Sequence, residues 1–269
     1  MKSKKSNKKL TSQLPSYKKP PVNEVICGMR YQIPANIWIP HIGVLWSKFR
    51  QEYPNIQHAN PIFSSPLEDV ATGLPLPRIW FINEQDDQLI QFQFDRFYYN
   101  WRRRNDNYPR YPHVINKFKQ TFDLISAFFD ENGFGQVLPL ELELSYINHI
   151  PQGEGWEISE DIQNLFTDFK WESRTGRFLP KPMKIKWTSI FQLPNEKGLL
   201  TVNIKEAKRM IDKVPVIVFE LIAKRTCETT IKQDEMYSWY DLAHEWIVRG
   251  FTDLTIPKVQ KDVWEIENA

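Results

Sequence analysis

The sequence predicts an α+β protein in which a mainly antiparallel sheet is covered by two long amphipathic helices. Three observations predict this class: runs that alternate apolar and polar residues, two long stretches with apolar residues three and four apart, and short turns between neighbouring strands. Hairpins in place of strict β-α-β alternation favour α+β over α/β. We expect two halves of the β-α-β-β-α type, related by an internal duplication and joined in one structural unit.

The first half is expected over residues 20–135. Apolar residues alternate in its strands, and Val114, Phe118 and Phe122 lie on one stripe of its long helix. Five prolines between two elements predict a stiff loop, and loops of such length are often functional. The expected elements are a strand at 22–33, a helix at 37–53, the proline-rich loop at 54–77, strands at 78–83 and 89–99, and a helix at 114–129.

The second half is expected over residues 136–257, followed by a C-terminal extension over 258–269. Its sequence repeats features of the first half: SYINHIP resembles the earlier MRYQIP, and YDLAHEWIVRGF resembles the earlier FDLISAFF. Similarity at equivalent positions predicts the duplication. The expected elements are a strand at 140–150, a short helix at 159–169, strands at 183–193, 199–205 and 215–226, and a helix at 234–251. In the strand at 183–193, the side chains expected to point inward are Met183, Ile185, Trp187, Phe191 and Leu193.

Charge is distributed unevenly along the chain. Residues 1–19 carry seven lysines and no acidic residue, which leaves 28 of the 35 basic residues against 33 acidic ones elsewhere. This composition predicts a disordered basic tail. No apolar run follows the lysines or approaches the roughly 18 residues of a membrane span, so we expect no signal peptide and no membrane association. Cys27 and Cys227 lie in apolar runs, which predicts buried free thiols and a reducing, cytoplasmic setting.

Motifs that would indicate catalysis are missing from the sequence. It contains no P-loop, no complete dinucleotide-binding glycine motif, no H-E-x-x-H, no C-x-x-C and no nucleophile elbow. We therefore expect no catalytic residue, no cofactor and no metal ligand. Glu141 and Glu143 share one face of a strand, where paired carboxylates can hold Mg²⁺. The interpretation we favour is cross-strand ion pairing with Lys184 and Lys186.

The most distinctive chemistry lies at the end of the strand predicted at 89–99, where arginines and aromatic rings crowd together. Arginine pairs with phosphates and flat rings stack on bases, but Trp, Tyr and Arg also dominate the hot spots of protein interfaces. A third interpretation is structural, with rings that pack the next helix and solvated arginines. The net negative charge of the body favours a protein interface over nucleic acid. The candidate binding residues are Arg96, Trp101, Arg102, Arg103, Arg104, Tyr108, Arg110 and Tyr111.

Four short motifs occur in a fixed order along the chain. They are Pro20-Pro21 with Glu24-Val25, Asp95-Arg96-Phe97 with Trp101, Tyr146-Ile147-Asn148, and His244 seven residues before Phe251. In these motifs the chain resembles a sporadically distributed family of uncharacterised prokaryotic proteins, over residues 20 to about 256. Such proteins often carry paired acidic residues on the penultimate strand, whereas residues 216–221 hold only Glu220. The resemblance implies no known activity, and it points to an accessory protein of mobile or defence-linked gene clusters.

These observations lead to a functional expectation with two alternatives. We expect a non-enzymatic, cytoplasmic interaction or regulatory protein, whose protein partner is encoded by a neighbouring gene and contacts the Arg/aromatic residues and the proline-rich loop. The alternative is a protein that binds or processes nucleic acid with the same arginines and the lysine-rich tail. A third hypothesis is an enzyme with a metal ion held by Glu141 and Glu143.

Overall fold

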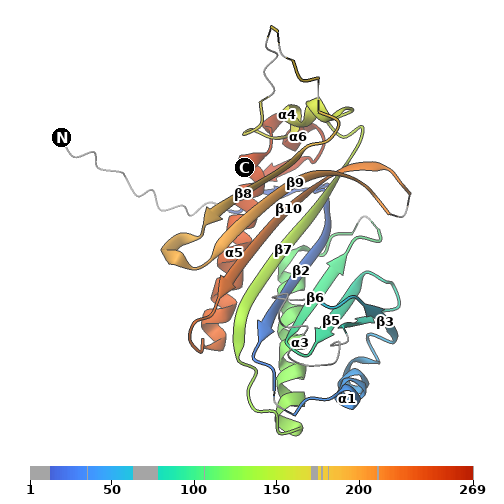
Figure 1. Ribbon diagram of the computed structural model, residues 1–269, viewed down its shortest axis with the longest axis vertical. Coiled ribbons are helices and arrows are strands. Elements are labelled where there is room, and N and C mark those ends of the chain that lie inside the picture. Colours follow the sequence, from blue (N-terminus) through green and yellow to red (C-terminus); the bar gives the residue numbers. More distant parts are fainter. Residues whose placement is uncertain are drawn as a thin grey trace, which may run out of the picture.

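The computed structural model describes residues 13–34, 36–62, 78–105, 107–170, 175–176, 178–180, 182–210 and 212–268. Within them, nine strands form one antiparallel sheet, and two short strands pair separately with each other. Helices occur between runs of consecutive strands along the chain (Figure 1). The predicted α+β class and the mainly antiparallel sheet are therefore confirmed.

The elements fall in two runs along the chain. The first run comprises β1 (Ser16–Tyr17), β2 (Val22–Tyr31), α1 (Ile39–Phe49), β3 (Asn55–Ala59), β4 (Arg78–Ile82), β5 (Gln88–Gln93), β6 (Arg96–Arg102) and α3 (Arg110–Glu131). The second comprises β7 (Pro139–Pro151), the 3-10 turn η1 (Ser159–Asp161), α4 (Ile162–Leu165), β8 (Lys186–Gln192), η2 (Pro194–Glu196), β9 (Leu199–Lys208), β10 (Pro215–Thr226), α5 (Gln233–Leu254), α6 (Pro257–Asp262) and β11 (Ile266–Asn268).

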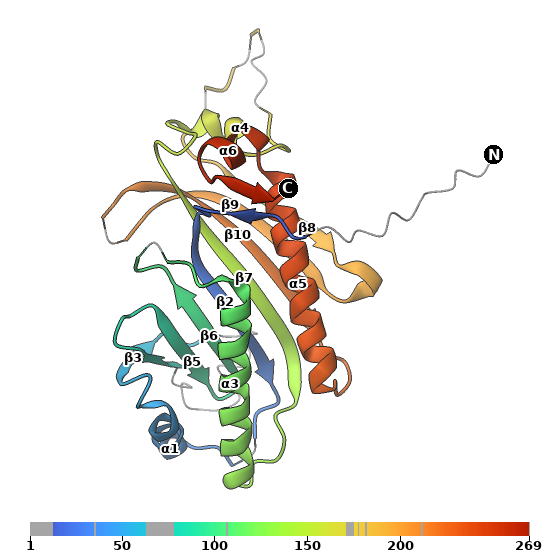
Figure 2. The same cartoon turned by 180° about the vertical axis from the view of Figure 1, so that it is seen from behind.

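The strand order of the large sheet is β3-β4-β5-β6-β2-β7-β10-β9-β8. At its centre β2 and β7 pair antiparallel, with Val25 opposite Tyr146 and Cys27 opposite Leu144. Beyond β2 lie β6, β5 and β4 in that order, and beyond β7 lie β10, β9 and β8. α3 packs on β6 and β2, and α5 packs on β7 and β10. Figure 2 shows that both helices lie on the same face of the sheet.

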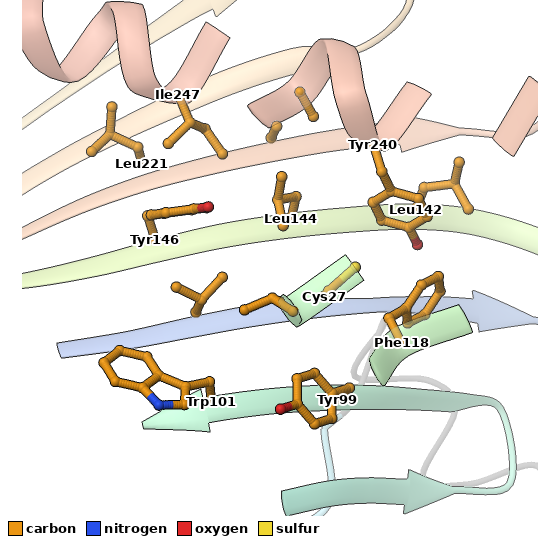
Figure 3. Close-up of a cluster of buried hydrophobic side chains, with 14 of the residues drawn as sticks. Cys27, Tyr99, Trp101, Phe118, Leu142, Leu144, Tyr146, Leu221, Tyr240 and Ile247 are labelled. Carbon is orange, nitrogen blue, oxygen red and sulfur yellow. The ribbon is translucent and has the colours of Figure 1, made fainter. Parts of the chain in front are cut away.

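The core lies between this face of the sheet and the two helices. Alternate side chains of neighbouring strands, such as Tyr99, Cys27 and Leu144, are buried there in register across the sheet. Phe118 of α3 and Tyr240 of α5 meet them from the helical layer (Figure 3). Because strand side chains alternate between faces, a residue's phase decides whether it enters this core.

The prediction of a single strand at 89–99 is wrong. The chain turns at Phe94 and Asp95, and Gln93 pairs with Arg96, so the run is a hairpin of β5 and β6. The alternating pattern does not reveal the turn, because Phe94 is itself buried and continues the apolar phase of β5. The arginine and aromatic residues therefore belong to β6 and the segment after it, not to the end of one long strand.

Other differences concern the edges of the sheet. β3 lies inside the predicted proline-rich loop as an exposed edge strand, and residues 63–77 of that loop lie outside the described residues. The short helix predicted at 159–169 is reduced to η1 and α4. Met183 was expected to point inward, but it precedes β8 and is 93% exposed, and Phe191 is exposed as well. An edge strand has fewer neighbours, so its apolar side chains stay partly in solvent.

Both chain ends join the fold beyond the predicted boundaries. β1 pairs with β11, and Tyr17 is buried against Phe251 and Trp264, with ring centroids 5.3 and 6.4 Å away. The prediction of a disordered segment over 1–19 is therefore wrong for residues 16–19, and residues 1–12 lie outside the described part. The C-terminal extension contains α6 and β11, and Trp264 is buried.

Candidate functional site

The structure distributes the eight predicted site residues over four environments. Arg96 lies on the sheet face opposite the helices and is only 5% exposed. Its guanidinium forms an ion pair with Asp95, at 2.5 Å between Nη2 and Oδ2, and its Nε donates to the same carboxylate at 3.0 Å. A buried arginine engaged in this way is held at the β5–β6 turn and offers little surface to a partner.

Trp101 belongs to the core. It lies opposite Val25 on β2, in the phase that faces the helices, and it is 2% exposed (Figure 3). Its ring centroid is 5.1 Å from that of Tyr108. A side chain buried this deeply stabilises the fold through packing and is not placed to anchor a protein partner.

Three consecutive arginines at the end of β6 bind groups of their own chain. Arg102 and Arg104 both pair with the carboxylate of Asp86, the second at 2.8 Å between Nε and Oδ2. Arg103 donates to the backbone oxygens of Val22 and Pro20, both at 2.8 Å. These contacts tie the end of β6 to the β4–β5 turn and to the start of β2, which is the structural interpretation of the three side chains.

The remaining three candidates, Tyr108, Arg110 and Tyr111, meet at a cavity of about 210 Å³. Its walls come from the segment around β1, the start of α3, the sheet strands β7 and β10, and the inner face of α5. Figure 3 shows two of these walls, with Tyr146 beside Leu221 and Ile247. The side chains that line the cavity are mostly apolar: Leu14, Pro15, Ser16, Tyr17, Pro20, Val22, Tyr108, Arg110, Tyr111, Pro112, Tyr146, Asn148, Leu221, His244, Ile247, Val248 and Phe251.

A chain of hydrogen bonds crosses the wall of this cavity. The Tyr108 hydroxyl donates to that of Tyr146 at 3.2 Å, and the Tyr146 hydroxyl lies 3.1 Å from Nδ1 of His244. Burial lowers the pKa of His244 to about 4, so its ring is neutral at pH 7. With Tyr108 as donor, the Tyr146 proton points to Nδ1, which leaves the imidazole proton on Nε2.

The ring of His244 is held in place by Tyr111. The two rings are stacked 3.9 Å apart at 6°, and the Tyr111 hydroxyl donates to Oδ1 of Asp241 at 2.8 Å. Burial also raises the pKa values of Tyr111 and Tyr146, and it raises the pKa of Tyr108 to about 12. The tyrosines are therefore neutral hydrogen-bonding groups at pH 7 and not bases.

Asn148 lines the same cavity and carries a buried polar atom without a partner among the described residues. The side chain is 1% exposed, and its Nδ2 donates to the backbone oxygen of Phe219 at 2.9 Å. That bond fixes the orientation of the amide, and Oδ1 has no hydrogen-bond partner among the described residues. An unpaired buried acceptor costs about 1–3 kcal/mol. Seven buried side-chain polar atoms lack a partner among the described residues, and Oδ1 of Asn148 is the one that belongs to a residue lining this cavity.

Arg110 lies at the mouth of the cavity. It is exposed, its guanidinium donates to the backbone oxygen of Tyr17 at 2.8 Å, and it lies 5.5 Å from the ring centroid of Tyr108. No acidic side chain of the described residues pairs with it. Its backbone φ of 67° lies in the left-handed region, which non-glycine residues seldom adopt. α3 begins here, and no side chain within the described part caps it.

The residues of this site that were not predicted include Tyr17, Tyr146, Asn148 and His244. The sequence did hold a signal for Asn148, because it follows Leu142, Leu144 and Tyr146 at steps of two and so occupies an apolar phase of β7. A polar residue in a core phase needs a partner or a ligand. Tyr17 carried no such signal, since it was assigned to the basic tail.

The predicted alternative site at Glu141 and Glu143 is an ion-pair cluster. Lys224 of β10 lies 3.2 Å from the first carboxylate and 2.9 Å from the second. The ion pairing was predicted, but the partner is Lys224 and not the lysines before and on β8, because β10 is the strand next to β7. Among the described residues, no group of His, Cys, Asp and Glu is placed to hold a metal ion.

Comparison with other proteins adds no assignment: the chain matches no family model, no curated protein and no solved structure. Within the part of the chain described, no helix is long and apolar enough to cross a membrane. The cavity beside α5 is the candidate binding site of the described residues.

Proposed function

We propose that the protein is a non-enzymatic interaction or regulatory protein, and that the cavity beside α5 is its binding site. One observation carries the proposal: Oδ1 of Asn148 is buried in the wall of this cavity without a partner. An apolar pocket with a few convergent polar groups is the usual form of a ligand site. A ligand with an N–H or O–H group would satisfy this buried acceptor after a small shift of the side chains around it.

The chemistry of the lining supports binding over catalysis. The imidazole of His244 is neutral and its Nδ1 is engaged by Tyr146, while the nearby tyrosines hold their protons at pH 7. These groups orient a ligand through hydrogen bonds. The mostly apolar walls of this pocket suit recognition of an apolar group, since burial of apolar surface contributes about 25 cal/mol per Å².

The setting we propose is the prokaryotic cytoplasm, with a protein partner encoded by a neighbouring gene of a mobile or defence-linked cluster. The two cysteines are free and buried, which fits a reducing compartment. The gene context rests on the family resemblance of the sequence motifs alone. We also propose that the halves arose by duplication, which the symmetric strand order about β2 and β7 supports.

Nucleic-acid binding, the alternative expected from the sequence, has weaker support. Arg102, Arg103 and Arg104 are engaged by Asp86 and by backbone oxygens. Five of the seven lysines of the predicted tail lie in residues 1–12, outside the described part. Binding of nucleic acid with a steep salt dependence, unaffected by filling the cavity, would favour this alternative.

Two small aromatic probes test the proposed site. 4-Methylphenol carries one O–H donor for Asn148, whereas toluene has the same ring and no donor. We expect both to bind by ligand-observed NMR, with the phenol about five- to tenfold tighter, as one net hydrogen bond allows. Val248→Trp should abolish binding of both probes, because Val248 lines the cavity.

The matched control is Val44→Trp, the same change at an exposed position of α1. It should bind both probes as the unaltered protein does. Failure of both probes to bind the unaltered protein, or equal binding by Val248→Trp, would refute the proposed site.

A further inference from the structure

We infer that the cavity beside α5 recognises an apolar carboxylate that carries an N–H group next to the acid, as an N-acylated apolar amino acid does. This inference rests on the proposed function and names the chemistry of the ligand. It follows from three features of one cavity: its apolar walls, the orphan acceptor of Asn148 and the unpaired cation of Arg110.

The apolar part of the ligand is assigned by the walls of the cavity. Leu221, Ile247 and Phe251 line it from β10 and α5, and Val22 lines it from β2. A volume of about 210 Å³ is several times the share of one water in the liquid, about 30 Å³. The space therefore fits an organic group such as a leucine or phenylalanine side chain.

The N–H group is assigned by Asn148. Since Nδ2 is fixed on the backbone oxygen of Phe219, only the acceptor Oδ1 remains for a ligand, which would reach this buried atom after a small shift of the side chains around it. An acceptor selects a donor, and the described residues that line the cavity include no carboxylate to balance an ammonium group, so we assign an uncharged amide N–H. A ligand with only acceptors at this point would leave Oδ1 unpaired and would meet repulsion from it.

The carboxylate is assigned by the mouth of the cavity. Arg110 uses one N–H on Tyr17, and no acidic side chain of the described residues neutralises its charge. The guanidinium has five N–H donors in a planar fork, so several remain for a carboxylate. α3 also begins at Arg110, and the first-turn N–H groups of a helix favour an anion.

The backbone at Arg110 supports a binding assignment for its side chain. A left-handed conformation is unfavourable for any residue with a Cβ, and glycine would adopt it freely. An arginine at this place keeps its guanidinium over Tyr108 at the mouth. Strain of this kind is concentrated at functional sites.

Two sources can supply this chemistry: a free N-acylated amino acid or the C-terminal residue of a partner protein. Both present an apolar side chain, an amide N–H and a carboxylate in the same order. Capture of a terminal carboxylate is a known mode of peptide recognition. The experiment therefore contains an arm for each source.

Isothermal titration calorimetry of the full-length protein tests the inference with four ligands. They are N-acetyl-L-phenylalanine, its primary amide, and a hexapeptide ending in phenylalanine with a free or an amidated C-terminus. We expect each acid to bind at least tenfold tighter than its amide, as a charged hydrogen bond contributes. A peptide that binds tenfold tighter than the acetylated amino acid identifies a protein C-terminus as the source; equal affinities identify the free acid.

Variants separate the two polar contacts. Arg110→Gln should remove the preference for the acids over the amides, whereas Arg104→Gln, a charge-matched control outside the cavity, should keep it. Asn148→Leu should weaken every N–H ligand by about five- to tenfold and leave toluene binding unchanged, which shows that the cavity persists.

Equal affinity for acids and amides, or an unchanged preference in Arg110→Gln, would overturn the inference. If the phenol and toluene still bind in a manner that depends on Val248, the proposed binding site stands and only the ligand chemistry is wrong. If no probe binds, both fail together.

Discussion

At the scale of single residues, His244 links the cavity to the pH dependence of stability. Its folded pKa of about 4 lies below the ordinary 6.5, so the unfolded chain takes up a proton at higher pH than the folded chain does. The free energy of unfolding is therefore undiminished above about pH 6.5 and falls as the pH drops from 6.5 to 4. The full effect is up to about 3 kcal/mol, at 1.36 kcal/mol per pKa unit.

The measurement is urea unfolding of the protein and of His244→Phe between pH 4 and 7.5. The variant keeps a ring to stack on Tyr111 and cannot titrate, so its stability should fall less with acid. Burial also lowers the pKa values of His149 and His113. The free energy of unfolding of the variant should therefore still fall with acid, but less steeply. His58→Phe, on the exposed face of β3, is the control. Equal slopes for His244→Phe and the unaltered protein would contradict the prediction.

Arg110 gives a second prediction at this scale, because its backbone conformation and its side chain act in opposite directions. Arg110→Gly and Arg110→Ala both lose the bond to Tyr17, but only glycine adopts a φ of 67° without strain. We expect the glycine variant to be more stable than the alanine variant by about 1 kcal/mol in urea unfolding. A more stable alanine variant would show that Arg110 does not hold this conformation in solution.

The candidate site could be predicted only in part from single residues. Tyr108, Arg110 and Tyr111 were singled out by residue type, and they do meet at the cavity. Residue type did not distinguish them from Trp101, which is buried, or from Arg103, which binds backbone oxygens. That distinction depends on which side chains of β6 face the helices. The sequence did not show this, because the turn between β5 and β6 was not predicted.

At the scale of elements, β1 is a strand that the sequence concealed within a lysine-rich segment. Tyr17 is 5% exposed, packs on Phe251 and Trp264, and shares a hydrogen bond of 2.8 Å with the Thr252 hydroxyl. Composition averages over a segment, so one buried tyrosine among lysines does not change the average.

Substitution of Tyr17 tests whether β1 belongs to the folded core. Tyr17→Ala should lower the free energy of unfolding by about 3 kcal/mol, the usual cost of removing a buried ring. Tyr17→Phe should cost about 1 kcal/mol, for the hydrogen bond alone. Ser16→Ala, on the other side of the strand, serves as control. A change below 0.5 kcal/mol in Tyr17→Ala, measured by urea unfolding, would place β1 outside the cooperative unit.

Regular elements with clear periodicity were predictable, and their ends or edges were not. β10 was predicted at 215–226, as observed, because a polar segment precedes it and apolar residues run through it. The helix predicted at 114–129 extends to Arg110–Glu131, and β3 was missed since an exposed edge strand shows no apolar phase. Tertiary packing decides these cases, and single-strand patterns do not record it.

At the scale of the whole molecule, one core joins both halves through the central pair of β2 and β7. Cys27 lies at its middle and is 0% exposed, and burial raises the pKa of its thiol.

Reaction of this thiol with iodoacetamide therefore needs a large opening of the sheet and helices. In Cys227→Ser, we expect Cys27 to be alkylated at least about 10³-fold more slowly than in urea, as a stability of 5 kcal/mol or more requires. Rapid labelling of the native variant would show that the halves open independently.

The central claim is that the cavity beside α5 binds a ligand through the free acceptor of Asn148. A crystal structure of the protein with 4-methylphenol tests it most directly. We expect the ring of 4-methylphenol to lie between Tyr146 and Ile247, with its hydroxyl about 2.5–3.0 Å from Oδ1 of Asn148. A cavity without the phenol, together with an Asn148 amide turned onto a donor of its own chain, would contradict it.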